Sequence, residues 1–70
     1  MEAEIIEQDV LLQAGDFNVY LCCYGAHEMW VERISTGEAA DLPKADTHAA
    51  LQLPAERRGE ALERIWRAHA

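Results

Sequence analysis

Two runs rich in aromatic and β-branched residues lie in the middle of the chain, at residues 17–24 and 29–34. The connection between them contains Gly25, and the second run is followed by a Ser-Thr-Gly stretch at 35–37. Runs of this type, bounded by turn residues, are typical of strands. The pattern therefore predicts a β-hairpin that uses approximately residues 17–24 and 29–34.

The segment that precedes this hairpin has two interpretations. As a strand over approximately residues 4–13, it would pair with the next run through a turn at Ala14-Gly15-Asp16. As a helix, it would place Ile6, Val10 and Ala14 on one face, with Gly15 at its C-terminal cap. We favour the strand, because a two-stranded ribbon is marginally stable and a third strand lets one face become a core.

The C-terminal segment has the clearest helical pattern, over approximately residues 55–69, and Pro54 suits its first turn. One apolar stripe runs through Leu62, Ile65, Trp66 and His69. Acid-to-base pairs of favourable order occur four residues apart, at Glu60–Arg64 and Glu63–Arg67. Gly59 lies on the stripe side, where glycine costs about 1 kcal/mol relative to alanine. We expect a close approach of the helix to the sheet there as compensation.

A second, short helix is predicted over approximately residues 44–52, in which Asp46 and Thr47 suit the cap of a turn over residues 48–51. The fold class is therefore α+β: a single domain, 1–70, in which a small antiparallel meander of about three strands packs against a C-terminal amphipathic helix. A chain of this length buries roughly 60% of its unfolded surface, so its core is thin.

Alternation along the central strand gives the sheet two apolar faces. Phe17 and Val19 point to one side, and Tyr20, Cys22 and Tyr24 point to the other. The length of the hairpin loop decides which face receives Trp30, and the sequence leaves this register open. One helix covers only one face. The second face is then covered by residues 43–52, by a second copy of the chain or by another protein, unless Tyr20 and Tyr24 simply lie exposed as amphipathic residues.

Charge is distributed unevenly. The net charge is −7, and residues 1–32 contain no Lys or Arg. Their seven acids are Glu2, Glu4, Glu7, Asp9, Asp16, Glu28 and Glu32. Such a field repels nucleic acid and anionic membranes and attracts basic surfaces, although the same charge also serves solubility.

Several classes are disfavoured by the sequence. The longest apolar run, 19–26, is far shorter than the roughly 20 residues of a membrane span. The acidic start, Met1-Glu2-Ala3-Glu4, is unlike a signal peptide, which leads us to expect a cytoplasmic protein with free thiols. Adjacent Cys22 and Cys23 diverge on a strand, so a bridge between them is not expected.

The chemistry-bearing residues form no recognisable catalytic or metal motif. A zinc site built from Cys22 or Cys23 with His27 and His48 lacks the paired ligand spacing that such sites use. A thiol–imidazole pair such as Cys22 with His27 lacks an orienting third group and a cleft. We therefore expect no catalytic residue, no metal and no cofactor.

Two functions remain. In the first, the chain is an acidic protein-binding domain that occupies a basic surface of a larger partner through the seven acids of residues 1–32, with Tyr20, Tyr24 and Trp30 as the apolar part. By size and charge the chain looks like the small acidic inhibitors that phages make, such as anti-CRISPR or anti-restriction proteins. The resemblance is one of class, without a shared motif. In the second, the chain is a small structural or regulatory module that self-associates, as a homodimer for example, through the Tyr20/Cys22/Tyr24 face, and the acids provide only solubility.

Overall fold

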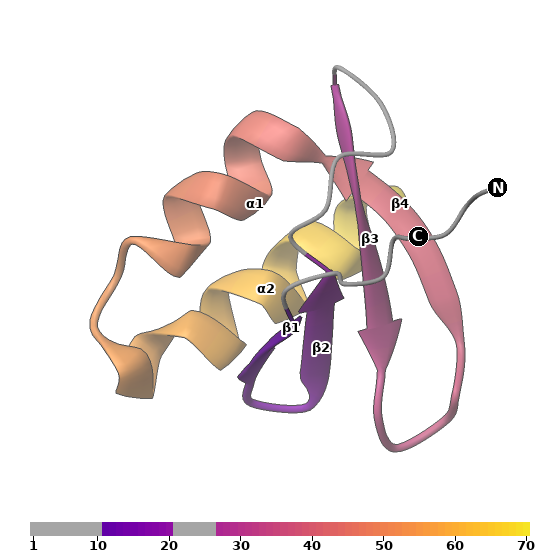
Figure 1. Cartoon of the computed structure of the whole chain (residues 1–70), viewed down its shortest axis with the longest axis horizontal. Helices are drawn as coiled ribbons and strands as arrows, with labels where there is room; N and C mark the ends of the chain where they lie inside the picture. The colour runs from indigo at the N-terminus through magenta and orange to yellow at the C-terminus, as the bar shows by residue number, and fades with distance from the viewer. Residues whose placement is uncertain (1–10, 21–26) are drawn as a thin grey trace, which may run out of the picture.

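The computed structural model of the chain describes residues 11–20 and 27–70, which form one antiparallel sheet followed by two helices. The elements are β1 (Leu11–Ala14), β2 (Phe17–Tyr20), β3 (Glu28–Arg33), β4 (Ala39–Pro43), α1 (Lys44–Leu51) and α2 (Ala55–His69). The strands lie in sequence order in the sheet, β1-β2-β3-β4 (Figure 1). The α+β class is confirmed, but the sheet has four strands where about three were predicted.

The strand interpretation of the first segment is confirmed for the part that is described. Ala14 pairs with Phe17, which leaves Gly15 and Asp16 as a two-residue turn between β1 and β2. Of these two turn residues, only Gly15 has positive φ, at 58°, which is the pattern of a type II′ hairpin turn. The helical alternative, with Gly15 as a cap, is wrong for residues 11–14. The predicted strand positions 4–10 and 21–24 lie outside the described residues.

The fourth strand was not predicted, because residues 39–43 contain no β-branched or aromatic side chain. Residues 39–43 form a strand because they pair with β3. The Ser-Thr-Gly turn ends at Gly37, which has a φ of 79°. The turn reverses the chain, so that β4 pairs with β3 and places Leu42 opposite Met29. Leu42 is completely buried in this position, and its burial stabilises a strand that has little intrinsic strand propensity.

The register between β2 and β3 settles which face receives Trp30. Val19 lies opposite Val31, and Tyr20 lies opposite Trp30. Val19 and Val31 are completely buried, whereas Trp30 is 37% exposed. Trp30 therefore shares the outer face of the sheet with Tyr20, which is one of the two registers that the sequence left open.

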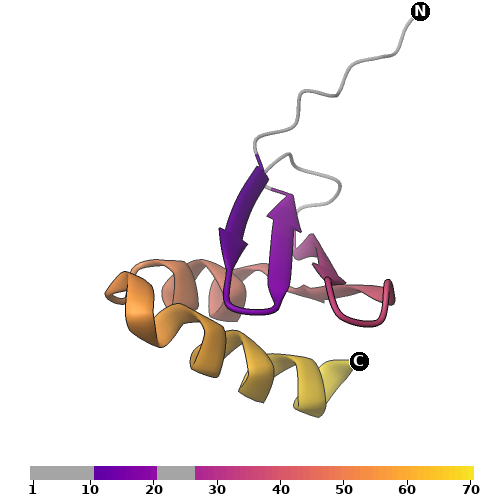
Figure 2. The ribbon, with the colours of Figure 1, turned by 90° about the horizontal axis from the view of Figure 1, so that it is seen from below.

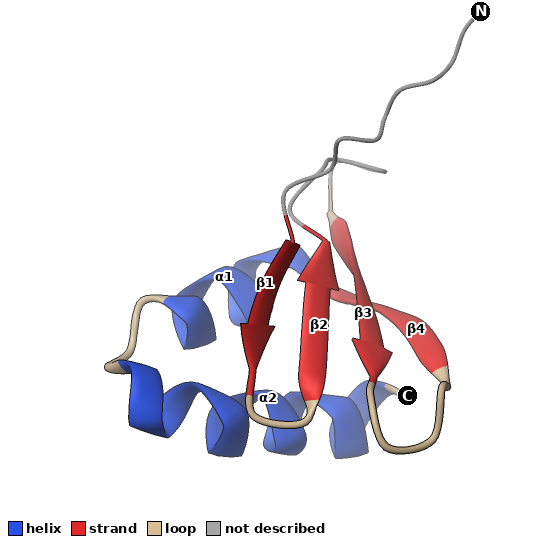
Figure 3. Cartoon of the chain, turned by 60° about the horizontal axis from the view of Figure 1, so that its bottom comes forward, coloured by secondary structure: helices blue, strands red, loops and turns tan. Residues whose placement is uncertain are grey.

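Both helices cover the same face of the sheet. Figure 2 shows α1 and α2 side by side, and Figure 3 shows both of them behind the four strands. Their buried residues join one core with the inward-facing strand residues: Ala14, Phe17, Val19, Met29, Val31, Leu42, Ala50, Leu51 and Leu62. The hypothesis that residues 43–52 cover the second face is therefore wrong, because α1 needs the same apolar face as α2.

The two helices lie where the pattern placed them, with small differences at their ends. α1 begins directly after Pro43, so Asp46 and Thr47 lie inside the helix and do not cap it, contrary to expectation. Pro54 occupies the N-cap of α2. Along the predicted stripe, Leu62 is buried, whereas His69 is exposed at the end of the helix. The stripe therefore packs from Leu62 to Trp66 and leaves its last residue outside the core.

Candidate protein-interaction site

Trp30 lies at the centre of the outer face, with aromatic and acidic neighbours on all sides. Tyr20 is directly opposite it on β2, and Asp41 is directly opposite it on β4. Directly opposed residues have Cβ atoms about 4.5–5.5 Å apart. Glu28 and Glu32 lie two residues away along β3, on the same face and about 6.6–6.8 Å distant. The result is an exposed indole within reach of three carboxylates.

Glu32 is held in place by a neighbouring aromatic side chain. The Tyr20 hydroxyl donates a hydrogen bond to Glu32 Oε1 at 3.2 Å. The interaction is diagonal across β2 and β3, which fixes the phenol and the carboxylate on the same side of Trp30. We call the five residues Tyr20, Glu28, Trp30, Glu32 and Asp41 the outer-face patch.

The structure brings some of the predicted site residues together, and others lie outside the residues that it describes. Glu28, Glu32, Tyr20 and Trp30 come together in the outer-face patch. Asp41 belongs to it but was missed, because residues 39–43 were not assigned to a strand. If residues 39–43 are taken as a strand paired with β3, the alternation of side chains along that strand places Asp41 on the outer face. The remaining predicted residues Glu2, Glu4, Glu7, Asp9 and Tyr24 lie outside the described residues.

Asp16 is used inside the fold. Its Oδ1 accepts the backbone N–H of Ser35 at 3.0 Å, and its Oδ2 accepts the Ser35 hydroxyl at 2.6 Å. Oδ2 also forms an ion pair with Arg33 at 3.3 Å. These interactions, the Ser35 hydroxyl first, hold the pKa of the Asp16 carboxyl below its ordinary value. Asp16 thus ties the β1–β2 turn to the end of β3, and we leave it out of the interaction surface.

Arg33 is a structural centre that the sequence interpretation did not identify. Its Nη2 contacts both carboxylate oxygens of Glu63 on α2, at 2.9 and 3.0 Å. Its guanidinium carbon lies 4.8 Å from the ring centroid of Phe17 and 5.2 Å from that of Trp66. The hydrogen bonds from Arg33, followed by those from Arg67, lower the pKa of Glu63. The available signal was a lone base on an otherwise acidic strand.

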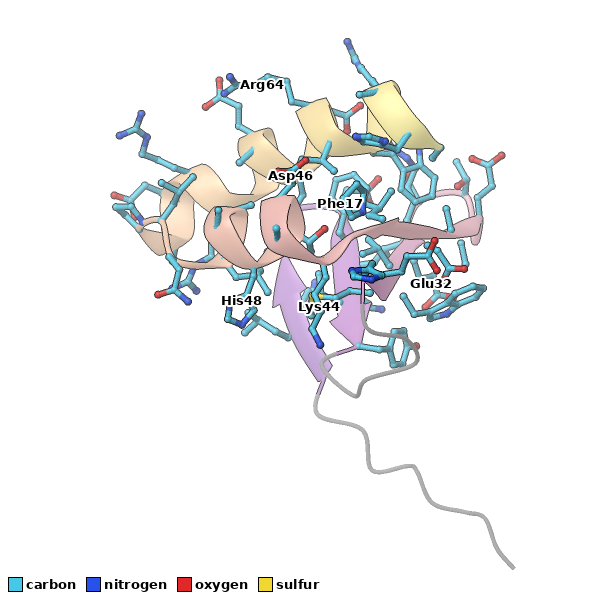
Figure 4. All side chains as sticks on the ribbon, turned by 90° about the horizontal axis from the view of Figure 1, so that it is seen from above. Phe17, Glu32, Lys44, Asp46, His48 and Arg64 are labelled. Atoms are coloured by element: carbon cyan, nitrogen blue, oxygen red, sulfur yellow. The ribbon has the colours of Figure 1, made fainter. Side chains whose placement is uncertain are left out.

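The basic residues of the protein lie away from the outward-facing positions of the strands. The six basic residues are Arg33, Lys44, Arg57, Arg58, Arg64 and Arg67. Arg33 points inward, and the other five belong to the two helices, so none occupies an outward-facing strand position. Figure 4 shows Glu32 beside the sheet and Arg64 on the far side of the helices. The outer face therefore presents a negative field without a balancing cation on the strands.

Two hollows elsewhere offer less to a ligand. A cavity of about 500 Å³ is lined by His27, Pro43, Lys44, Ala45 and His48. The structure thus brings together the two histidines that the sequence suggested as metal ligands. Within residues 11–20 and 27–70, no three His, Cys, Asp or Glu side chains are placed to hold a metal ion. A second hollow, of about 390 Å³, lies between α1 and α2, with Asp46 and Arg64 among its lining residues.

Neither helix of the described residues is both long and apolar enough to cross a bilayer. Comparison with known proteins gives no relative: no family model matches the chain, and no curated protein or solved structure matches it. Function is therefore inferred from the chemistry of the surface alone.

Proposed function

We propose that this chain is a small acidic protein-binding domain that places its outer-face patch on a positively charged, nucleic-acid-binding surface of a larger protein. One observation carries the proposal: an exposed tryptophan lies among three carboxylates on a sheet face where no outward-facing position of the described strands carries a basic residue. The role requires no catalytic residue, metal or cofactor. Residues 1–10 add four further acids to the negative charge of the chain.

The two components of the patch have different physical tasks. Carboxylates steer a basic partner during encounter and discriminate against acidic ones. Buried aromatic side chains such as tryptophan commonly provide much of the binding free energy of an interface. Trp30 lies opposite Tyr20 and Asp41, so the aromatic and the acidic components of the patch occur side by side. A protein seated there would cover a basic surface that otherwise binds phosphates.

Such a contact would inhibit nucleic-acid binding by the partner protein. A domain that occupies a nucleic-acid-binding surface competes with the nucleic acid, as in the anti-CRISPR or anti-restriction type of inhibitor. The high negative charge of the chain also disfavours direct binding to nucleic acid. The partner we propose is therefore a protein, and the mode of action is competition.

Self-association is the second candidate, and the exposure of Trp30 and Ile34 favours it. Ile34, which follows β3, is 42% exposed. A symmetric dimer, however, brings the same patch of both copies together. The three carboxylates of the patch would then meet their own copies without a cation from the strands, which costs free energy. The charge of the outer face thus favours a basic partner over a second copy.

Affinity capture at two salt concentrations tests the proposal. The wild-type chain and the triple variant Glu28→Gln/Glu32→Gln/Asp41→Asn serve as baits, and the control is Glu56→Gln/Glu60→Gln, which removes two acids from α2. We expect proteins that the wild type and the control retain at low salt, that heparin displaces, and that the triple variant loses. Retention that is indifferent to both salt and the triple substitution would contradict the proposal.

Sedimentation of the free chain tests the second candidate. We expect a monomer at micromolar concentration, with no change on Trp30→Glu. A wild-type dimer that Trp30→Glu converts to a folded monomer would instead establish self-association through this face.

A further inference from the structure

Arg33 is an arginine whose binding groups lie within this protein. The Arg33 guanidinium lies over the rings of Phe17 and Trp66, at 4.8 and 5.2 Å from their centroids. Glu63 and Asp16 supply carboxylate oxygens at 2.9 and 3.3 Å. Aromatic faces and carboxylates thus surround one planar cation, an arrangement that suits guanidinium chemistry.

The outer-face patch contains the same groups. Trp30 is 37% exposed and lies directly opposite Tyr20 and Asp41. Glu28 and Glu32 flank it along the strand. None of the six basic residues of the chain lies at an outward-facing strand position to complete the set. Among the described residues, the charge of the patch carboxylates around Trp30 is complementary to a cation.

We propose that Trp30 receives an arginine side chain of the partner, which stacks on the indole while the flanking carboxylates accept its N–H groups. This inference rests on the proposed function, because it specifies the side chain that a basic surface would place on the patch. The occupant is a protein arginine and not a lysine.

The preference for arginine follows from the geometry of the two cations. A guanidinium is planar and weakly hydrated, and it can stack on a ring while donating in its own plane to carboxylates on two sides. A lysine ammonium is compact and strongly hydrated, so it pairs with one carboxylate at a time and gives up more hydration on contact with the ring. Glu28 and Glu32 on one strand and Asp41 on the next lie around Trp30 and suit the planar ion.

Two short peptides of equal length and charge provide the test. One carries arginine and the other lysine at every basic position, and each is titrated into the full chain at low salt. Binding is followed by NMR shifts of the Trp30 indole and of the patch amides. We expect the arginine peptide to bind about fivefold more tightly, the size of a modest cation–π contribution.

Variants assign the preference to the patch. Trp30→Ala should reduce the arginine-to-lysine ratio of affinities to near one, whereas Glu56→Gln/Glu60→Gln on α2 should leave it unchanged. If Trp30→Ala fails to fold, Trp30→Gln and Glu32→Gln/Asp41→Asn take its place. Each variant is checked for native NMR dispersion.

The outcomes separate this inference from the function on which it rests. Equal affinity for the two peptides, or an arginine preference that survives loss of Trp30, overturns the arginine inference and leaves the basic-surface function standing. Failure of both peptides to bind at low salt overturns both. An arginine preference that depends on Trp30 and on the patch carboxylates supports both.

Discussion

Gly15 and Gly59 meet backbone to backbone, and neither position has room for a side chain. A Cβ on Gly59 would lie 2.9 Å from the Gly15 Cα, and a Cβ on Gly15 would lie 2.7 Å from the Gly59 Cα. Gly15 is in the β1–β2 turn and Gly59 is in α2. The contact sets how closely α2 approaches the sheet, and so determines how deeply Leu62, one turn further along the helix, can insert into the core.

Substitution of Gly59 by alanine should destabilise the protein, although alanine is the better helix former. Helix propensity favours Gly59→Ala by about 1 kcal/mol, and overpacking against backbone costs about 1–3 kcal/mol. We expect a net loss of up to about 2 kcal/mol in the free energy of unfolding, measured by urea denaturation. A gain in stability would show that α2 can move away from the turn without cost.

Two further glycine variants distinguish the backbone strain of a positive φ from the steric clash of an added Cβ. Gly37 has positive φ, and a Cβ added there would meet no atom within 4 Å, so Gly37→Ala should lose only the left-handed backbone term, about 1–2 kcal/mol. Gly15→Ala combines positive φ with the contact to Gly59 and should lose more than Gly37→Ala. Equal losses at the two positions would contradict a collision at Gly15.

The sequence predicted a close approach of the helix at Gly59, but it did not identify Gly15 as the partner. A glycine on the apolar side of a helix has an unfavourable propensity, and that local conflict indicated a close approach at Gly59. Residues 39–43 offered no such signal, because their strand depends on pairing with β3. Asp41 was missed for that reason. The identity of the outer face depended on loop parity, which the pattern of apolar residues did not fix.

Arg33 illustrates a different limit. Its isolation in an acidic segment was visible, but its partners Asp16 and Glu63 lie 17 and 30 residues away in sequence. Contacts of that range are determined by the tertiary fold. The inward position of Arg33 opposite Phe17 became evident only with the register of β2 and β3.

Replacing Arg33 by lysine should destabilise the protein, because lysine cannot contact Glu63 and Asp16 through one planar group while stacking on Phe17. We expect a clearly lower urea midpoint. The control is Arg67→Gln, whose side chain is 77% exposed against 17% for Arg33 and whose loss should leave the midpoint nearly unchanged. Similar midpoints for the two variants would argue against a structural role for Arg33.

Low pH should weaken the ion pairs of Arg33 with Asp16 and Glu63. The folded-state pKa of Glu63 lies below its ordinary value of 4.5, and that of Asp16 lies below 3.8. At low pH the unfolded chain therefore binds protons that the folded protein does not, so this contribution is complete above pH 4.5 and is lost as the pH falls through the lower folded-state values.

Thermal unfolding from neutral to strongly acidic pH checks this prediction. The advantage of the wild type over Glu63→Gln should be present at neutral pH and should shrink as the pH falls below 4.5. A difference between the two proteins that does not vary with pH would mean that Glu63 acts only through packing.

Thr47 offers a route to a more stable protein. It is completely buried on α1, and its Oγ1 has no hydrogen-bond partner among the described residues. A buried polar group without a partner costs about 1–3 kcal/mol, so Thr47→Val should raise the free energy of unfolding by about 1 kcal/mol. Thr47→Ser keeps the hydroxyl and loses a methyl group, and it should lower stability. Loss of stability in Thr47→Val would indicate that the hydroxyl is satisfied in solution.

The negative field around Trp30 can be measured without any partner. Its emission is obtained as the difference between the wild type and Trp30→Phe, because Trp66 is the only other tryptophan. Relative to a free tryptophan derivative, caesium should quench Trp30 more strongly than iodide does, since Glu28, Glu32 and Asp41 attract the cation and repel the anion. The triple variant Glu28→Gln/Glu32→Gln/Asp41→Asn should remove this bias, and Glu56→Gln/Glu60→Gln should keep it. Quenching of Trp30 that is equal for both ions would show that the patch lacks the field on which its proposed recognition of a basic surface depends.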